Sequence, residues 1–338
     1  MRPRRWMVVG LALGCRAGEA TRVQPPAAHD RMARTAEKLT DFTRSELAKQ
    51  FVVSARSLPV IALRTVYRDA EKKHAFTEGE ARALPESERR SLTAVPIDDE
   101  AYYTPPQYGD VFAYARAFDV WAEASGREHA TWSGMRVFDF GYGGVGHLRM
   151  LASLGVDAVG VDPDPVLRAM YAAPTDQGAI GAGSVRLVSG RFAADPGITE
   201  AIGTGYDLVI SKNVLKRGYI HPTRRAPEKW LIALGVDDDT FLGAIRHALA
   251  PGGWFVIYNI CPAEAPEGQP FKPWSDGHSP FSEAQLRAAG FDVMAFDRDD
   301  TAAVRQMGRI LGWDVGDEKV DLEHDLFATY TLVHLPVR

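Results

Sequence analysis

The chain has 338 residues, of which 46% are hydrophobic and 25% charged, and its formal net charge is −5 at pH 7. This length and composition suit one large globular domain or two small ones. The mixed, slightly acidic charge argues against a dedicated nucleic-acid-binding protein, which would carry a strongly basic face. Because Cys15 and Cys261 are the only cysteines, a disulfide framework is excluded as well.

The first fifteen residues have the layout of an export signal. Arginines at positions 2, 4 and 5 precede an apolar run from Trp6 to Gly14, which is too short to span a bilayer as a helix. The ending from Leu11 to Cys15 resembles the cleavage box of bacterial lipoproteins, whose lipidated cysteine anchors the protein to a membrane. Two locations therefore stay open: a membrane-anchored or periplasmic lipoprotein if the leader functions, and the cytoplasm if it does not.

Residues 16–107 are expected to form a linker followed by a helical N-terminal extension. Residues 19–30 are small, polar and proline-bearing, as linkers are. Apolar residues at near-helical spacing predict an amphipathic helix over residues 30–56. A second, more polar helical segment is predicted over residues 71–90, and its charges are interpreted as a solvated face.

From residue 108 to the end of the chain, strands alternate with helices, which is the pattern of a doubly wound, mostly parallel α/β sheet. A helix over residues 111–122 is predicted to lead into the first strand. The expected strands are residues 135–140, 158–161, 185–188, 206–211, 254–259, 291–296 and 327–335. The expected helices are residues 145–154, a segment from 165, and residues 239–249, 282–289 and 301–313.

The segment from Gly141 to Gly146 has the Gly-x-Gly-x-x-Gly spacing of nucleotide-binding loops, and Asp162 follows at the end of the next strand. Glycines there permit a tight turn and let a ligand approach the backbone and the following helix N-terminus. Without a ligand they would form only a turn, and Asp162 would only cap a helix. Asp139 at the tip of the strand would repel a pyrophosphate, whereas it suits a ligand with an amino group and a positive sulfur.

The run from Asp139 to Gly143, DFGYG, resembles the first motif of class I S-adenosylmethionine-dependent methyltransferases, although Gly146 departs from the commonest place of the later glycine. Residues 249–260, LAPGGWFVIYNI, resemble that family's Pro-Gly-Gly turn and fifth strand, and residues 281–296 resemble its last helix and sixth strand. Two consecutive strands end the chain, as in the family. The resemblance, which covers residues 108–338, therefore implies a seven-stranded sheet with an antiparallel C-terminal strand.

The resemblance also implies a cofactor, S-adenosylmethionine, and a small molecule that accepts the methyl group at oxygen or nitrogen. Asp139, Gly141 and Gly143 would line the methionine end of the cofactor, and Asp162 would bind the ribose hydroxyls. The expected cofactor-binding set is Asp139, Gly141, Gly143, Gly146, Asp162 and Ser211.

Acceptor groups are expected beyond the carboxyl ends of the fourth and fifth strands, where ligands bind in open α/β sheets. Lys212, Asn213 and His221 are the candidate catalytic residues, because they could hold an anionic acceptor and His221 could serve as a base near neutral pH. The neighbouring basic residues are interpreted as a solvated surface; they are Lys216, Arg217, Arg224 and Arg225.

A second candidate wall of the site is the proline-rich loop after the fifth strand, which contains Trp274, Asp276 and His278. Simple packing of the loop is the alternative interpretation, as it is for the tyrosines of residues 102–108. The nine histidines and two cysteines show no metal-ligand spacing, so no metal is predicted.

Two other functions stay open. An NAD(P)-dependent oxidoreductase would use the same glycine loop and Asp162, and an all-parallel sixth strand would favour it over the terminal hairpin. A non-catalytic exported protein that retains the methyltransferase fold would suit the leader, because S-adenosylmethionine is made inside the cell.

Overall fold

The structure is a computed structural model that describes residues 28–103, 107–317 and 319–337. The predicted leader, its Cys15 and most of the predicted linker lie outside the described residues. None of the described helices combines the length and the apolar character that a membrane span requires.

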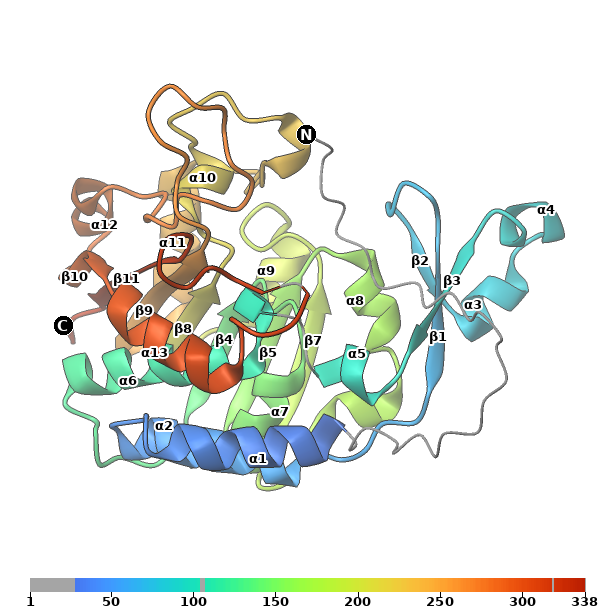
Figure 1. The fold of residues 1–338 in the computed structure, drawn as a ribbon, viewed down its shortest axis with the longest axis horizontal. Coiled ribbons are helices and arrows are strands. Elements are labelled where there is room, and N and C mark those ends of the chain that lie inside the picture. Colours follow the sequence, from blue (N-terminus) through green and yellow to red (C-terminus); the bar gives the residue numbers. More distant parts are fainter. Residues whose placement is uncertain (1–27, 104–106, 318, 338) are drawn as a thin grey trace.

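An eight-stranded sheet forms the centre of the described chain, in the order β10-β11-β9-β8-β4-β5-β7-β6 (Figure 1). β4, β5, β7, β8 and β9 pair in parallel, and β11 runs antiparallel between β9 and β10. The predicted doubly wound, mostly parallel sheet with an antiparallel C-terminal strand is therefore confirmed. The strands are β4 (Arg136–Phe140), β5 (Asp157–Asp162), β6 (Gly178–Ile180), β7 (Gly183–Ser189), β8 (Tyr206–Lys212), β9 (Leu249–Cys261), β10 (Asp292–Asp299) and β11 (Phe327–His334).

The prediction of seven strands is wrong by one. The additional strand, β6, pairs antiparallel with the start of β7 through a tight turn at Gly181, whose φ is +60°. Three residues, one of them glycine, are too few to show the alternation of apolar and polar residues by which a strand is recognised in a sequence. β6 lies at the edge of the sheet, away from β4 and β8.

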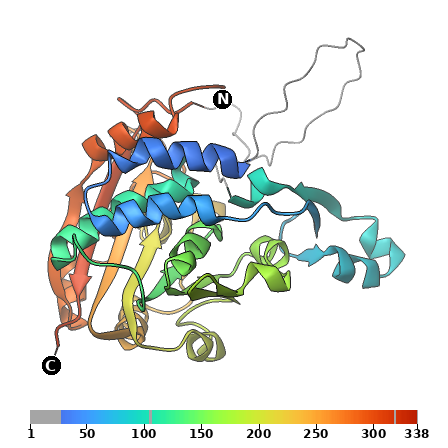
Figure 2. The same ribbon diagram turned by 90° about the horizontal axis from the view of Figure 1, so that it is seen from below.

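Helices cover both faces of the sheet (Figures 1 and 2). Side chains alternate between the two cores along each strand: Val137 and Leu208 face one layer, and Phe138 and Val209 the other. The first layer contains α1 (Ala28–Thr40), α2 (Glu46–Ser54), α6 (Tyr114–Ser125), α7 (Gly146–Ser153), α8 (Pro165–Met170) and α13 (Thr301–Leu311). The second contains α9 (Pro196–Ile202), α11 (Asp238–Ala248) and α12 (Glu283–Ala288).

The single helix predicted over residues 30–56 is wrong, because the chain breaks between α1 and α2. Asp119 of α6 is buried and accepts hydrogen bonds from the backbone N–H groups of Arg44 and Ser45 and from the Ser45 hydroxyl. The Ser45 hydroxyl also caps α2 by accepting from Ala48 N at 3.1 Å. Both helices bury their apolar faces in the same core, so the apolar periodicity continues across the break.

The prediction that the N-terminal extension is helical is only partly correct. The extension also includes a small antiparallel sheet that projects from one side of the main body (Figures 1 and 2). Arg64 donates to Asp176 at 2.6 Å, and Arg168 donates to the Ala75 carbonyl at 2.7 Å, so two arginines attach this sheet to the rest of the fold. Its elements are β1 (Arg64–Arg68), β2 (Ala75–Thr77), α3 (Glu78–Ala83), α4 (Glu86–Arg89), β3 (Thr93–Ile97) and α5 (Asp99–Tyr103).

A buried ion pair joins α6 to the start of α13. Arg116 donates two hydrogen bonds of 2.8 Å to Asp300, and the Tyr258 hydroxyl donates to the same carboxylate at 2.6 Å. The side chains of Arg116 and Asp300 are only 9% and 6% exposed. Asp300→Ala should lower the free energy of unfolding by about 3–5 kcal/mol, because it leaves a guanidinium buried without a counter-charge.

Denaturation with urea measures this loss. The matched control is Glu283→Gln, which removes the charge from the exposed pair with Arg287 and should change stability far less. Equal losses in the two variants would contradict the assignment of the Arg116–Asp300 pair as a stabilising contact.

Candidate functional site

The carboxyl ends of β5, β4 and β8 lie side by side because these strands are neighbours in the sheet. Asp162 ends β5, the glycine loop of residues 141–146 follows β4, and Lys212 ends β8. Together they border a cavity of about 240 Å³, which we call the glycine-loop cavity. It is lined by Tyr103, Gly109, Val111, Tyr114, Gly141, Tyr142, Gly143, Gly144, Gly146, His147, Asp162, Lys212, Asn213 and Val214.

The glycine loop comes so close to the loop after β8 that Gly141 has no room for a side chain. The N–H of Gly141 still pairs with the Val161 carbonyl at 2.8 Å, and its φ is +78°. A Cβ at this position would lie 2.4 Å from Cγ2 of Val214. Gly143 has a φ of +57°, and Gly146 begins α7. The loop therefore needs glycine for both its backbone conformation and its packing.

Asp162 lines the cavity at the end of β5. Its Oδ1 accepts from the Asp164 N–H at 2.9 Å, and Oδ2 accepts from the Gly143 N–H at 3.4 Å. Burial raises the pKa of Asp162 to about 6, against the opposing effect of these hydrogen bonds. At neutral pH the side chain is a carboxylate whose Oδ2 is only weakly engaged, so it can accept hydrogen bonds from a ligand.

Lys212 and Asn213 line the opposite side of the cavity. Lys212 Nζ donates to the Tyr108 carbonyl at 2.8 Å, and Asn213 Nδ2 donates to the same carbonyl at 2.7 Å. Asn213 Oδ1 accepts from the Ile260 N–H at 2.6 Å, so this residue links the segment before α6 to β9. The geometry gives Asn213 a positioning role, whereas Lys212 presents a charged group at the cavity.

Asp139 does not line the cavity, contrary to the expectation that it would contact the cofactor directly. Its side chain is fully buried behind Tyr114 and His147, both of which do line it. The Tyr114 hydroxyl donates to Asp139 Oδ2 at 2.7 Å, and His147 Nε2 lies 2.5 Å from the same oxygen. Asp139 Oδ1 has no hydrogen-bond partner among the described residues.

His147 and Tyr114 are site residues that the sequence interpretation missed. Their rings stack with centroids 3.9 Å apart. Burial lowers the pKa of His147, although its bond to Asp139 opposes the effect, so we assign the neutral ring with its proton on Nε2. The position of His147, directly after the last glycine of the loop, was the signal that could have found it.

Two predicted site residues lie apart from the cavity lining. Ser211 is fully buried in β8, where its hydroxyl accepts from the Leu215 N–H at 3.3 Å. His221 follows the short helix α10 (Arg217–Ile220) and pairs with Asp238 at 2.9 Å, with half of its side chain exposed. The structure therefore brings together the glycines, Asp162, Lys212 and Asn213, but not Ser211 or His221.

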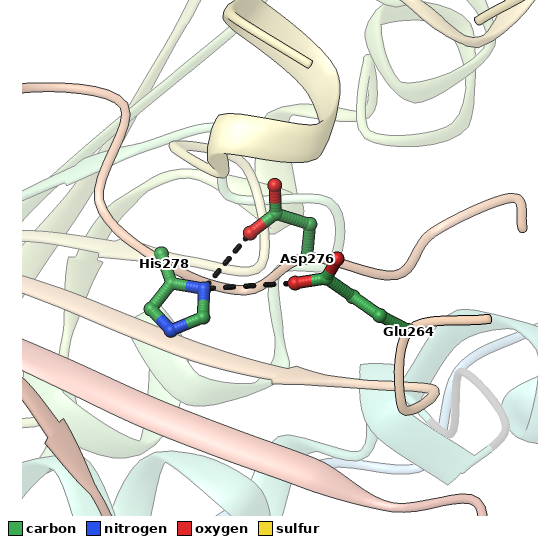
Figure 3. A group of neighbouring side chains, drawn as sticks. All are labelled: Glu264, Asp276 and His278. Atoms are coloured by element: carbon green, nitrogen blue, oxygen red, sulfur yellow. Dashed lines mark hydrogen bonds and ion pairs between the residues drawn. The ribbon is translucent and has the colours of Figure 1, made fainter. Parts of the chain in front are cut away.

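The loop after β9 contains a second group of polar side chains, formed by Glu264, Asp276 and His278 (Figure 3). His278 Nδ1 lies 2.9 Å from Asp276, and Arg217 Nε donates to the same carboxylate at 2.8 Å. Arg217 also lies 3.8 Å from Glu264. A guanidinium thus already supplies the positive charge beside these ligand-type groups, so we interpret the cluster as an ion-pair network that fixes the loop to α10.

No family model and no curated protein matches the chain. Among solved structures it is similar to the [4+2]-cyclase SpnF, with a TM-score of 0.39, 17% identity, and coverage of 66% of this chain and 81% of that one. For a geranyl diphosphate methyltransferase bound to GPP and sinefungin, the TM-score is 0.39 and the identity 13%, with coverage of 70% of this chain and 85% of that one. For the phosphoethanolamine N-methyltransferase 2 of Haemonchus contortus, bound to S-adenosyl-L-methionine, the TM-score is 0.36 and the identity 15%, with coverage of 86% of this chain and 74% of that one. At such values these likenesses carry no argument about function.

Replacement of Gly141 tests the close contact between the two loops. Gly141→Ala should destabilise the fold by more than the about 1–2 kcal/mol of a left-handed alanine, because Val214 must also move. Gly312→Ala is the matched control, since Gly312 ends α13 in the left-handed conformation, with a φ of +73°, and has open space where its Cβ would lie. Urea denaturation of both variants gives the difference, and equal losses would mean that Val214 moves without cost.

Proposed function

We propose that the chain is a class I S-adenosylmethionine-dependent methyltransferase that transfers a methyl group to oxygen or nitrogen of a small molecule. The observation that carries the proposal is the arrangement of the glycine loop, Asp162 and Lys212 around one cavity, on a sheet that ends in an antiparallel hairpin. The sheet order matters because it brings the ends of β5, β4 and β8 to the same edge.

The residues at the cavity fit S-adenosylmethionine. Asp162 offers a weakly engaged carboxylate oxygen to ribose hydroxyls, and Gly141 and Gly143 leave the backbone accessible. Behind the lining, Asp139 Oδ1 is buried without a partner among the described residues, which gives this region a negative character suited to a sulfonium and an amino group. When bound, the cofactor supplies the methyl group on its positive sulfur.

The chain's own contribution is to orient and to exclude water, because methyl transfer is a displacement at carbon. Asp162 would hold the ribose end, and the close approach of Gly141 to Val214 brings the two loops together along the cavity lining. A neutral amine or an anionic oxygen already carries the lone pair that attacks. We therefore assign no general base, and His221 in particular lies outside the lining.

The oxidoreductase alternative is less well supported. It would be favoured by a further parallel strand next to β9, whereas β9 pairs with the antiparallel β11. The same glycine loop and Asp162 would serve a dinucleotide, so ligand binding has to decide between the two functions.

Calorimetric titration with S-adenosylhomocysteine and with NAD tests the proposal. We expect saturable binding of S-adenosylhomocysteine and none of NAD. Asp162→Asn should weaken that binding by about 10- to 100-fold, the effect of removing the charge from a hydrogen-bonded acceptor. Asp164→Asn is the matched control, because Asp164 is exposed, does not line the cavity, and asparagine caps α8 equally well. Tight NAD binding, or equal effects of the two variants, would contradict the proposal.

The affinity for S-adenosylhomocysteine should also depend on pH. Burial raises the pKa of Asp162 to about 6, so the carboxylate that accepts the ribose hydroxyls is present above this pH and lost below it. We expect the dissociation constant to increase as the pH falls from 7 to 5. The Asp162→Asn variant should lack this part of the dependence, and an unchanged profile in the variant would assign the titration to another group.

A further inference from the structure

The glycine-loop cavity has a carboxylate at one end and an ammonium group at the other. Among the described residues that line it, Asp162 is the only acidic side chain and Lys212 the only one that carries a full positive charge at neutral pH. They end β5 and β8, which flank β4 on its two sides. Neighbouring strands are about 4.8 Å apart, so the two strand ends that carry these groups are separated by about 10 Å across the glycine loop.

Lys212 is buried and forms no direct ion pair within the described chain, although the charges of Asp139 and Asp110 act on it. It is 6% exposed, and no described carboxylate forms an ion pair with Nζ, whose one hydrogen bond within the described chain goes to the Tyr108 carbonyl. Nζ also lies 4.8 Å from the ring centroid of Tyr114. Asp139, on the neighbouring strand β4, is instead hydrogen-bonded to Tyr114 and His147. An ammonium group with unused donors at a cavity wall is therefore ready to bind an anion.

Burial affects the titration of this lysine as well. It lowers the pKa of Lys212 to about 8, although the negative charges of Asp139 and Asp110 oppose the effect. The amine stays mostly protonated at neutral pH, and a bound anion would stabilise the protonated form further.

We propose that Lys212 binds the α-carboxylate of the amino-acid moiety of the cofactor. This inference rests on the proposed function. A nucleoside whose ribose is held at Asp162 and whose chain crosses the glycine loop carries its anionic end to the end of β8. The neutral His147, which gives its Nε2 proton to Asp139, has no further proton to donate to a carboxylate. Lys212 is then the cationic donor available on the described lining.

The test compares two ligands that differ at the amino-acid end. S-adenosylhomocysteine has the carboxylate, whereas 5′-methylthioadenosine has the same nucleoside without the amino-acid moiety. Lys212→Met should raise the dissociation constant for S-adenosylhomocysteine by about 10- to 100-fold and change that for 5′-methylthioadenosine by less than about 3-fold. Calorimetric titration of both ligands measures the ratio.

The matched control is Lys216→Met. Lys216 is 2% exposed and bonds to the Ile260 carbonyl, but it does not line the cavity, so its replacement should leave the ratio of the two dissociation constants unchanged. Should Lys212→Met fail to fold, Lys212→Gln carries the same expectation, because its amide can still donate to the Tyr108 carbonyl.

Three outcomes would overturn the inference. An equal loss of affinity for both ligands in the Lys212 variant would assign Lys212 a structural role. Unchanged binding of both would leave an anionic acceptor, rather than the cofactor, as the partner of Lys212. If the unsubstituted protein binds 5′-methylthioadenosine and S-adenosylhomocysteine equally, the carboxylate has no site. Failure of the proposed function differs from all three, because the unsubstituted protein would then bind neither ligand.

Discussion

The buried carboxylate of Asp139 fixes the relation between the sheet and the helices that border the cavity. Its side chain is fully buried and accepts hydrogen bonds from Tyr114 of α6 and His147 of α7. Donors of this kind offset part of the cost of burying a charge. Because α6 precedes β4 and α7 follows it, this one side chain positions both helices that border the glycine loop.

α6 extends the same principle to the rest of the fold. Its Arg116 pairs with Asp300 at the start of α13, and its Asp119 accepts from the backbone that joins α1 to α2. Three polar side chains of α6 thus make these connections. Asp119 contacts the N-terminal helices, Tyr114 the central strand, and Arg116 the C-terminal hairpin. Buried polar contacts of this kind specify one arrangement among many that hydrophobic burial alone would permit.

The sequence was sufficient for the architecture wherever the structural signal was local. The alternation of strands and helices after residue 108 and the two strands that end the chain could be predicted, because each depends on the residues of its own segment. The predicted Pro-Gly-Gly turn, in contrast, lies inside the long β9. The break between α1 and α2 could not, since its cause is Asp119, which is more than seventy residues away in the chain. The strand β6 was missed because it is too short to be periodic.

The site was predictable to a smaller extent. Gly141, Asp162 and Lys212 were found because each stands at the end of a predicted strand, and parallel strands bring those ends to one edge. His221 was chosen for its chemistry and its nearness in sequence, but a helix after β8 carries it to the surface, where it pairs with Asp238. A residue that lies at a strand end is thus predicted to be at the site more reliably than one that lies a few residues further along the chain.

From the sequence, a direct contact between Asp139 and the ligand is expected to favour a sulfonium nucleoside over a dinucleotide. In the structure Tyr114 and His147 stand between that carboxylate and the cavity. Its charge still acts there, because a field weakens slowly with distance in a buried region of low dielectric. The charges at the lining itself discriminate more strongly between the two ligands. A carboxylate at β5 and an ammonium group at β8 suit a ligand with hydroxyls at one end and an anion at the other. A dinucleotide laid across the same loop would place its pyrophosphate near the centre, over the fully buried carboxylate of Asp139, where the described lining offers no cation.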